Sequence, residues 1–172
     1  LARLEVGDHL QDFVGPLGNP SDLEGLSRVC VVGGGVGCAI AYPQAKALHN
    51  AGARVDIIAG FRSDDLIILE DEMRAVSDWL AVATDDGSNG NKGFVTDLLR
   101  ARIDALAAAG EEPFERILAV GPLPMMRAVA NLTREYGIKT IVSMNTVMID
   151  GTGMCGGCRL TVGGKTVFAC VD

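Results

Sequence analysis

Short runs of β-branched and aliphatic residues alternate with longer helix-forming segments from residue 28 to residue 144. Strands buried on both faces read as continuous Val/Ile/Leu runs, and strand–helix alternation of this length implies a parallel sheet. Residues 66–76 suit either element, but their charged residues favour a helix. The pattern predicts an α/β fold with a doubly wound parallel sheet and right-handed crossovers. We expect strands over 28–32, 55–59, 79–84, 117–120 and 140–144, and helices over 38–50, 66–76, 95–109 and 125–136.

The end of the chain has a different composition from the sheet region. Residues 151–157 are rich in glycine, and Gly163-Gly164 separates two β-prone runs, 159–162 and 166–168. Two glycines between such runs are typical of a β-hairpin. We therefore expect a small C-terminal Cys-rich hairpin after the sheet. The predicted divisions are a linker (1–25), a nucleotide-binding domain (26–146) and a metal-binding segment (147–172).

Charge and hydropathy argue against two classes of partner. The formal net charge is -7 and no basic stripe is present, so nucleic acid is not an expected partner. The longest apolar stretch, from Val29 to Tyr42, is interrupted by glycines and is shorter than the ~20 residues that a membrane span needs. Five cysteines are an odd number, and three of them crowd the C-terminus. In a reducing cytoplasm, where we place the protein, this favours metal ligation over disulfides.

A glycine-rich turn follows the first expected strand directly. Its residues are Gly33, Gly34, Gly35, Val36 and Gly37. Such a turn lets the backbone approach a pyrophosphate, and the N-terminus of the following helix stabilises the negative charge. The spacing departs from a full G-x-G-x-x-G. A tight turn without a ligand is the alternative, but the strand–turn–helix context favours nucleotide binding.

Arg62 and Ser63 follow the second expected strand, at the edge where doubly wound folds contact the adenosine ribose. No acidic residue ends this strand, and these two side chains could bind a phosphate. The alternative is a solvated loop in which Asp64 and Asp65 pair with Arg62. The choice between NADH and NADPH as the bound nucleotide therefore stays open.

A proline-containing loop follows the fourth expected strand, with Gly121, Pro122, Leu123, Pro124 and Met125. It lies at the carboxyl end of the predicted sheet, where open α/β folds bind their ligands. Its alternative interpretation is a rigid turn, in which Pro124 occupies a first helical turn and the methionine packs.

The strongest signal is Asp150-Gly-Thr-Gly-Met-Cys155-Gly-Gly-Cys158, followed by Cys170 after eleven intervening residues. Cys-x-x-Cys brings two thiolates to one metal, and the expected hairpin returns Cys170 to the same end. Asp150 is the nearest candidate for a fourth ligand, although iron–sulfur clusters usually take four Cys. A structural zinc site is the main alternative. A redox dithiol is disfavoured because its usual context is a βαβ unit.

Together these motifs resemble the ferredoxin-reductase superfamily. The branch that they resemble most contains dihydroorotate dehydrogenase electron-transfer subunits, sulfide dehydrogenase subunits and the small subunit of NADH-dependent ferredoxin:NADP+ oxidoreductase. The resemblance implies that the loops bind NAD(P)H, Asp86 and Gly87 included. It rests on Val32-Gly-Gly-Gly-Val-Gly37, Gly60-Phe-Arg-Ser63, Thr84-Asp-Asp-Gly-Ser88, Lys92-Gly-Phe-Val-Thr-Asp97, Val120-Gly-Pro-Leu-Pro-Met-Met126 and residues 150–170.

The same resemblance implies a 2Fe–2S cluster held by Asp150 and by Cys155, Cys158 and Cys170. The pyrimidine-pathway subunit typically supplies four cysteines instead, which argues against that assignment. In the superfamily an N-terminal β-barrel carries FAD, and this sequence has no such barrel. We therefore expect the chain to begin where a flavin domain ends, and to show little activity alone.

The implied function is that of an electron-transfer subunit of a flavin/iron–sulfur oxidoreductase. It would pass electrons between NAD(P)H, FAD and a 2Fe–2S cluster to a catalytic partner subunit, with ferredoxin as a further candidate partner. No residue is assigned as a proton-transfer catalyst. The alternative function is a zinc-stabilised nucleotide-binding or assembly module without redox activity.

Overall fold

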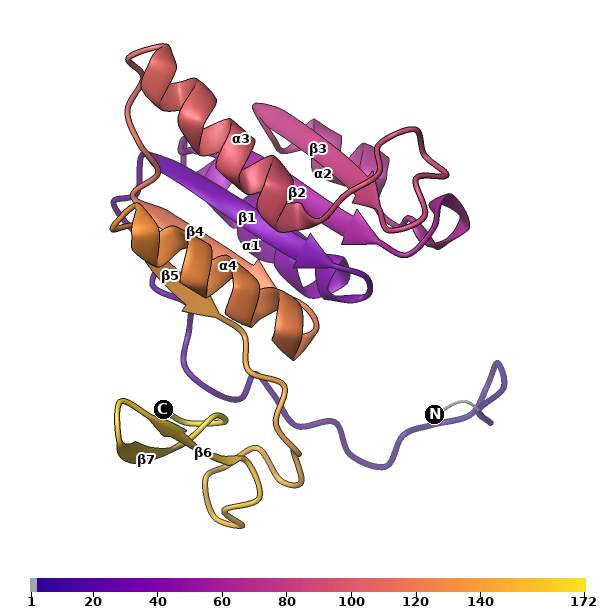
Figure 1. Cartoon of the computed structure of the whole chain (residues 1–172). Helices are drawn as coiled ribbons and strands as arrows, with labels where there is room; N and C mark the ends of the chain where they lie inside the picture. The colour runs from indigo at the N-terminus through magenta and orange to yellow at the C-terminus, as the bar shows by residue number, and fades with distance from the viewer. Residues whose placement is uncertain (1–2) are drawn as a thin grey trace. The chain divides into compact units, whose positions relative to one another are not determined.

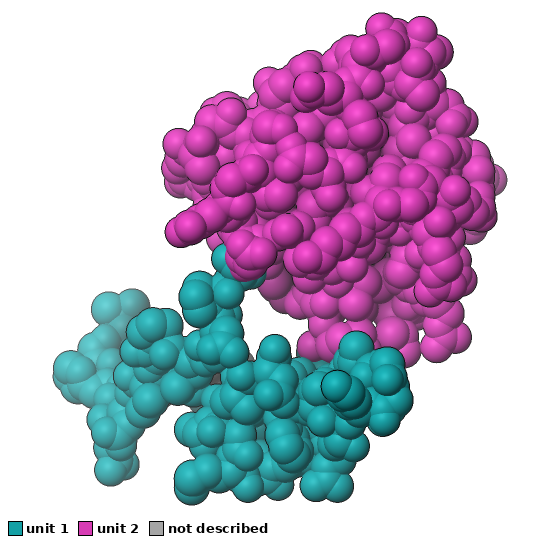
Figure 2. Space-filling view, turned by 90° about the vertical axis from the view of Figure 1, so that its left-hand side faces the viewer, with its two compact units in different colours: residues 1–21, 145–172 teal, residues 22–144 magenta. Residues whose placement is uncertain are grey.

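The computed structural model describes residues 3–172. It divides into two compact units, which Figure 2 shows in different colours. One unit is Asp22–Met144, and the other combines residues 1–21 with residues 145–172. This grouping of the first residues with the last was not predicted from the sequence. Within the described residues, no helix is long and apolar enough to cross a membrane.

A five-stranded sheet forms the centre of the larger unit (Figure 1), with strand order β3-β2-β1-β4-β5. All neighbouring strands are parallel. This confirms the predicted doubly wound sheet, because parallel neighbours require a crossover between strands. The strands are β1 (Arg28–Gly34), β2 (Arg54–Phe61), β3 (Trp79–Thr84), β4 (Arg116–Val120) and β5 (Lys139–Val142).

Helices cover both faces of the sheet (Figure 1). Alternate residues of β1 enter opposite cores: Val29 and Val31 pack with residues of α1, while Cys30 and Val32 pack with residues of α3 and α4. This alternation follows from the two-residue period of a strand, and it explains why the strand is apolar throughout. The helices are α1 (Gly37–Asn50), α2 (Glu70–Ala75), α3 (Val95–Ala108) and α4 (Leu123–Glu135).

Two helices differ from their predicted extents by two residues or more. The segment expected as one helix over 66–76 is a short 3-10 helix, η1 (Asp64–Leu66), followed by α2. Leu69 adopts a left-handed conformation before α2, and three acidic residues follow it in the first turn. Their negative charges stabilise the helix by interacting with the positive end of its dipole. α4 begins at Leu123, two residues earlier than predicted. Pro124 fits there because the first helical turn needs no N–H from it.

The smaller unit contains an antiparallel hairpin of β6 (Arg159–Val162) and β7 (Lys165–Phe168). Gly163 and Gly164 connect the strands, and both have positive φ, at 55° and 80°. A two-residue turn with positive φ at both positions twists as its flanking strands do, which explains the Gly-Gly pair. The predicted C-terminal hairpin is therefore confirmed.

Candidate functional site

The glycine-rich turn leaves two backbone donors available at the start of α1. The N–H of Gly35 donates to the carbonyl oxygen of Gly60 at 2.8 Å, and Gly35 takes a positive φ of 54° to turn the chain. The N–H groups of Val36 and Gly37 find no acceptor among the described residues. The helix also has no side-chain cap at Val36. This turn can therefore bind an anion through free N–H groups and the positive end of the helix dipole.

Packing as well as ligand approach requires several of these glycines. A Cβ at Gly37 would lie 2.4 Å from the carbonyl oxygen of Val120, and one at Gly33 would lie 2.6 Å from the sulfur of Cys38. At Gly35 a Cβ would meet nothing within 4 Å, so that this position is open toward a ligand. Nucleotide binding and a tight turn without a ligand were the two interpretations predicted from the sequence. Close contact of α1 with β4 is a second reason for the motif.

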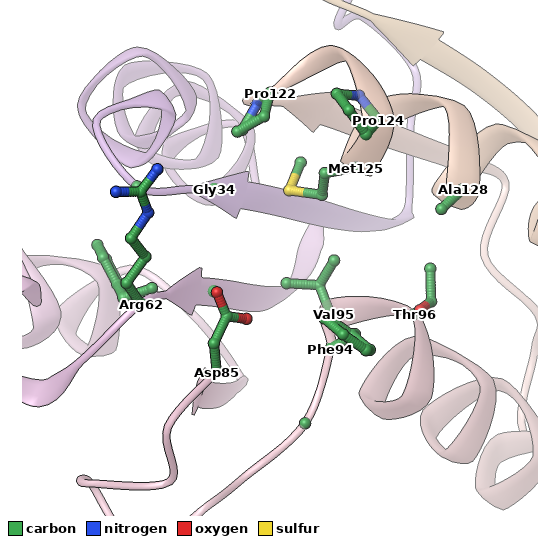
Figure 3. A pocket seen from close by; sticks show the side chains of 14 residues that line it. Gly34, Arg62, Asp85, Phe94, Val95, Thr96, Pro122, Pro124, Met125 and Ala128 are labelled. Atoms are coloured by element: carbon green, nitrogen blue, oxygen red, sulfur yellow. The ribbon is translucent and has the colours of Figure 1, made fainter.

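A cavity of about 520 Å³ lies at the carboxyl ends of the strands. In Figure 3, Arg62 and Asp85 lie at one end, and Thr96 and Ala128 at the other. The volume is in the range of sites that hold a small molecule or cofactor. The predicted residues that line it are Gly34, Gly35, Arg62, Pro122, Pro124 and Met125. Its other lining residues are Gly60, Phe61, Asp85, Gly93, Phe94, Val95, Thr96 and Ala128.

Several predicted cofactor-binding residues lie outside this lining. Gly121 packs against Met125, which lines the cavity, and a Cβ at Gly121 would lie 2.8 Å from Cε of Met125. Leu123 is half-exposed and borders a smaller hollow beside α4. The residues outside the lining are Gly33, Val36, Gly37, Ser63, Asp86, Gly87, Gly121 and Leu123.

The start of α3 forms one wall of the cavity, and its residues were not among the predicted cofactor-binding residues. Phe94, Val95 and Thr96 line the cavity, and Phe94 is 67% exposed. The signal was present, because helices that follow parallel strands begin at the same carboxyl edge. Lys92 to Asp97 entered the sequence analysis only as a motif of resemblance.

Arg62 is free to contact a ligand. Among the described residues that line the cavity it carries the one positive side chain, and it forms no ion pair with Asp64 or Asp65. The alternative of a self-paired loop is therefore not what the structure contains. An unpaired guanidinium at the mouth of an apolar cavity suits a phosphate or carboxylate.

Asp86 and Gly87 shape the loop after β3. The Asp86 carboxylate accepts hydrogen bonds from the N–H and the hydroxyl of Ser88, at 2.9 and 2.7 Å, and the hydroxyl bond lowers its pKa. Gly87 has a φ of 80° and packs on Lys92. Asp86 and Gly87 thus stabilise the conformation of this loop, and the neighbouring Asp85 lines the cavity.

Two of the three tail cysteines lie together. The thiol of Cys158 donates to the sulfur of Cys170 at 3.2 Å, and both residues are buried. This hydrogen bond raises the pKa of Cys170. The hairpin accounts for the pairing, since the N–H of Ala169 also donates to the carbonyl oxygen of Cys158. Cys155 is exposed, and its sulfur accepts the N–H of Gly157 at 3.4 Å.

Asp150 lies next to the backbone of Cys155. Its carboxylate accepts the N–H of Thr152 at 2.8 Å and that of Cys155 at 3.0 Å. The Thr152 bond is the largest cause of a lowered pKa, so that Asp150 is ionised at neutral pH. A carboxylate and three thiols are donors that iron or zinc accepts. Within the described residues, however, no three such side chains are gathered closely enough to hold a metal ion.

The other two cysteines belong to the sheet. Cys30 and Cys38 are fully buried, and burial raises the pKa of Cys38 to about 12. Neutral buried thiols act as small apolar side chains.

Comparison with known proteins assigns both parts of the chain. Residues 31–131 match the model of the oxidoreductase NAD-binding domain. The chain belongs to this NAD-binding oxidoreductase family. Residues 145–172 match the iron–sulfur cluster binding domain of dihydroorotate dehydrogenase B.

Individual relatives of the chain agree with the resemblance noted from its motifs. It is 50% identical over 172 residues to the Thermotoga maritima homologue of the dihydroorotate dehydrogenase B (NAD(+)) electron transfer subunit, covering 100% of this chain and 58% of the relative. The Fusobacterium nucleatum electron transfer subunit is 35% identical over 161 residues, covering 92% and 59%. A solved structure of NADH-dependent reduced ferredoxin–NADP oxidoreductase is 49% identical with a TM-score of 0.82, covering 96% and 58%. The chain thus spans less than two thirds of these relatives.

Proposed function

We propose that the chain is the nucleotide-binding and cluster-binding part of an electron-transfer subunit that works with a catalytic partner subunit. The observation that carries this proposal is the presence, in one chain, of an NAD-binding domain and an iron–sulfur cluster binding segment. Electron-transfer subunits among the relatives support it.

The cavity is the proposed seat of NAD(P)H. The pyrophosphate of the nucleotide would accept hydrogen bonds from the free N–H groups of Val36 and Gly37, and Arg62 would bind a phosphate at the end of the cavity where its guanidinium lies. The nicotinamide would lie against Pro122 and Met125. An apolar wall there excludes water from the ring that reacts.

Asp150, Cys155, Cys158 and Cys170 are the proposed ligands of a 2Fe–2S cluster. The donor set fits the group, because Cys158 and Cys170 already share a buried position and the Asp150 carboxylate is ionised. The N–H of Gly157, which donates to the sulfur of Cys155, would stabilise negative charge on that ligand. Binding would have to bring Cys155 and Asp150 to the buried pair.

When bound, these cofactors and an FAD supply hydride and single-electron chemistry, while the protein supplies placement and electrostatics. We assign the FAD to a part of the full-length protein outside this chain. The electrons would leave through a catalytic partner subunit, with ferredoxin as a further candidate. The protein would work in the cytoplasm.

Anaerobic titration of the full-length protein with NADH, and separately with NADPH, tests the proposal. We expect one nucleotide to reduce the cluster, giving an electron paramagnetic resonance signal. Asp150→Ala should weaken or abolish this signal, and Asp150→Cys should keep a cluster with an altered spectrum. A full-length protein that binds neither nucleotide, or an Ala variant with an unchanged spectrum, would contradict the corresponding part.

A further inference from the structure

The segment that precedes the NAD-binding domain contacts the cysteine tail. Residues 1–21 form one compact unit with residues 145–172 (Figure 2). The family model for cluster binding covers only residues 145–172. The early segment therefore adds contacts to the cluster-binding region that this match does not include.

Three consecutive residues make these contacts. The side-chain amide of Asn19 donates a hydrogen bond to the carbonyl oxygen of Val171 at 2.6 Å, across 152 positions of sequence. Gly18 lies beside Cys170, because a Cβ at Gly18 would be 3.3 Å from the Cys170 carbonyl oxygen. Leu17 lies against Gly151, where its Cδ1 is 3.0 Å from the place that a Cβ would take.

The contacts reach both ends of the ligand set. Val171 directly follows Cys170, and Gly151 directly follows Asp150. The hairpin fixes the turn that contains Cys170, since the N–H groups of Val171 and Asp172 both donate to the carbonyl oxygen of Phe168 at the end of β7. The backbone of Cys170 is thus fixed between the hairpin and the early segment.

We propose that Leu17, Gly18 and Asn19 position the cluster ligands, with Asn19 holding the Cys170 turn and Leu17 packing on the Asp150 turn. This inference rests on the proposed cluster. Groups that orient metal ligands without binding the metal change metal affinity by roughly 10- to 100-fold when they are replaced. The side-chain amide of Asn19 matters here, because the hydrogen bond needs its N–H.

The test compares Asn19 variants in the full-length, cluster-loaded protein. Asn19→Ala removes the donor, Asn19→Asp keeps the shape without an N–H, and Asn19→Gln keeps the amide. Asn50→Ala is the matched control, because Asn50 is an exposed asparagine at the end of α1. Two quantities are measured: the rate at which a chelator removes iron, and the midpoint potential of the cluster.

We expect Asn19→Ala and Asn19→Asp to lose iron about 10-fold faster than the parent protein and to show a shifted potential. Asn19→Gln should have an iron-release rate and a potential closer to those of the parent, and Asn50→Ala should have the same rate and potential as the parent. Nucleotide binding should be equal in all four variants, which shows that the NAD-binding domain is folded. A loaded parent protein whose Asn19→Ala variant keeps the same release rate and potential overturns the positioning role alone. A parent protein without any cluster overturns the proposed function and this inference together.

Discussion

The sulfur atoms of Cys158 and Cys170 lie 3.2 Å apart, although the residues are twelve positions apart in the chain. The β6–β7 hairpin produces this proximity by pairing Arg159 with Phe168 and returning the chain. The two thiols are buried, whereas Cys155 is exposed. The three cysteines are therefore unequal before any metal binds.

This geometry predicts a specific disulfide in the cluster-free protein. With oxidised glutathione, the thiols of Cys158 and Cys170 should lose two protons and two electrons and form one bond, while glutathione is reduced. Thiol titration after denaturation should then find three of the five cysteines free. Peptide mass mapping identifies the pair. A disulfide that joins Cys155 to Cys158 or to Cys170 would contradict the arrangement, and Cys155→Ser, which keeps the expected pair and removes the exposed thiol that glutathione could modify, is the control.

The glycine turn predicts a packing conflict that a second substitution relieves. Gly33→Ala should lower the free energy of unfolding by about 1–3 kcal/mol, because the new methyl group meets the sulfur of Cys38. Cys38→Ala in the same chain should recover part of this loss. Gly37→Ala should cost more and resist rescue, since its neighbour is the backbone of Val120. Urea denaturation measures the parent, the Gly33→Ala, Cys38→Ala and Gly37→Ala variants, and the Gly33→Ala/Cys38→Ala double variant. Strictly additive effects of Gly33→Ala and Cys38→Ala would contradict the contact.

Arg62 should contribute directly to nucleotide affinity. Arg62→Ala removes the positive charge from the cavity lining, and we expect a Kd at least about 10-fold higher, as for the loss of one charged hydrogen bond. The Kd of Arg62→Lys should lie between those of the parent and Arg62→Ala, because an ammonium keeps the charge but cannot form the bidentate hydrogen bonds of a guanidinium. Arg134→Ala, an exposed arginine at the end of α4, is the control. Calorimetric titration of the full-length protein provides the constants. Equal affinity in the Arg62 variants and the parent would remove Arg62 from the site.

Glu111 should stabilise the larger unit in a pH-dependent way. Its carboxylate lies 2.7 Å from the guanidinium of the buried Arg28 and 3.0 Å from that of Arg54, and Arg28 is the larger cause of its lowered pKa. A lowered pKa contributes stability above the unfolded value of about 4.3, and this contribution disappears as pH falls through the folded value. Glu111→Gln should therefore lower the urea midpoint at pH 7, and the difference should narrow below about pH 4. Glu112→Gln, its exposed neighbour, should change little. A Glu111→Gln difference that does not depend on pH would contradict the ion pair.

Local sequence pattern was sufficient for the sheet and for the hairpin. Continuous apolar runs placed the three central strands β1, β2 and β4, because strands buried on both faces are mostly apolar. The edge strands β3 and β5 were also predicted, although they are only partly buried. Gly163-Gly164 placed the β6–β7 turn for an equally local reason, since only glycine takes positive φ freely at both positions. The segment before α2 was less accessible, because the left-handed Leu69 that divides it has no signature in the sequence.

The candidate site was predictable only where one loop supplies it. Gly35 and Arg62 could be named because each follows a strand and must lie at its carboxyl end. The packing of Met125 on Gly34 and of Leu17 on Gly151 joins distant parts of the chain, and it depends on side-chain positions that spacing does not encode. The hydrogen bond from Asn19 to Val171 is of the same kind.

The metal content of the anaerobically purified full-length protein, without its partner, tests the central claim most directly. Three thiols and one carboxylate in the tail should hold about two irons and two acid-labile sulfides per chain, as a 2Fe–2S cluster requires. One zinc per chain with no labile sulfide would contradict the account, and would assign the cysteine tail to a structural metal.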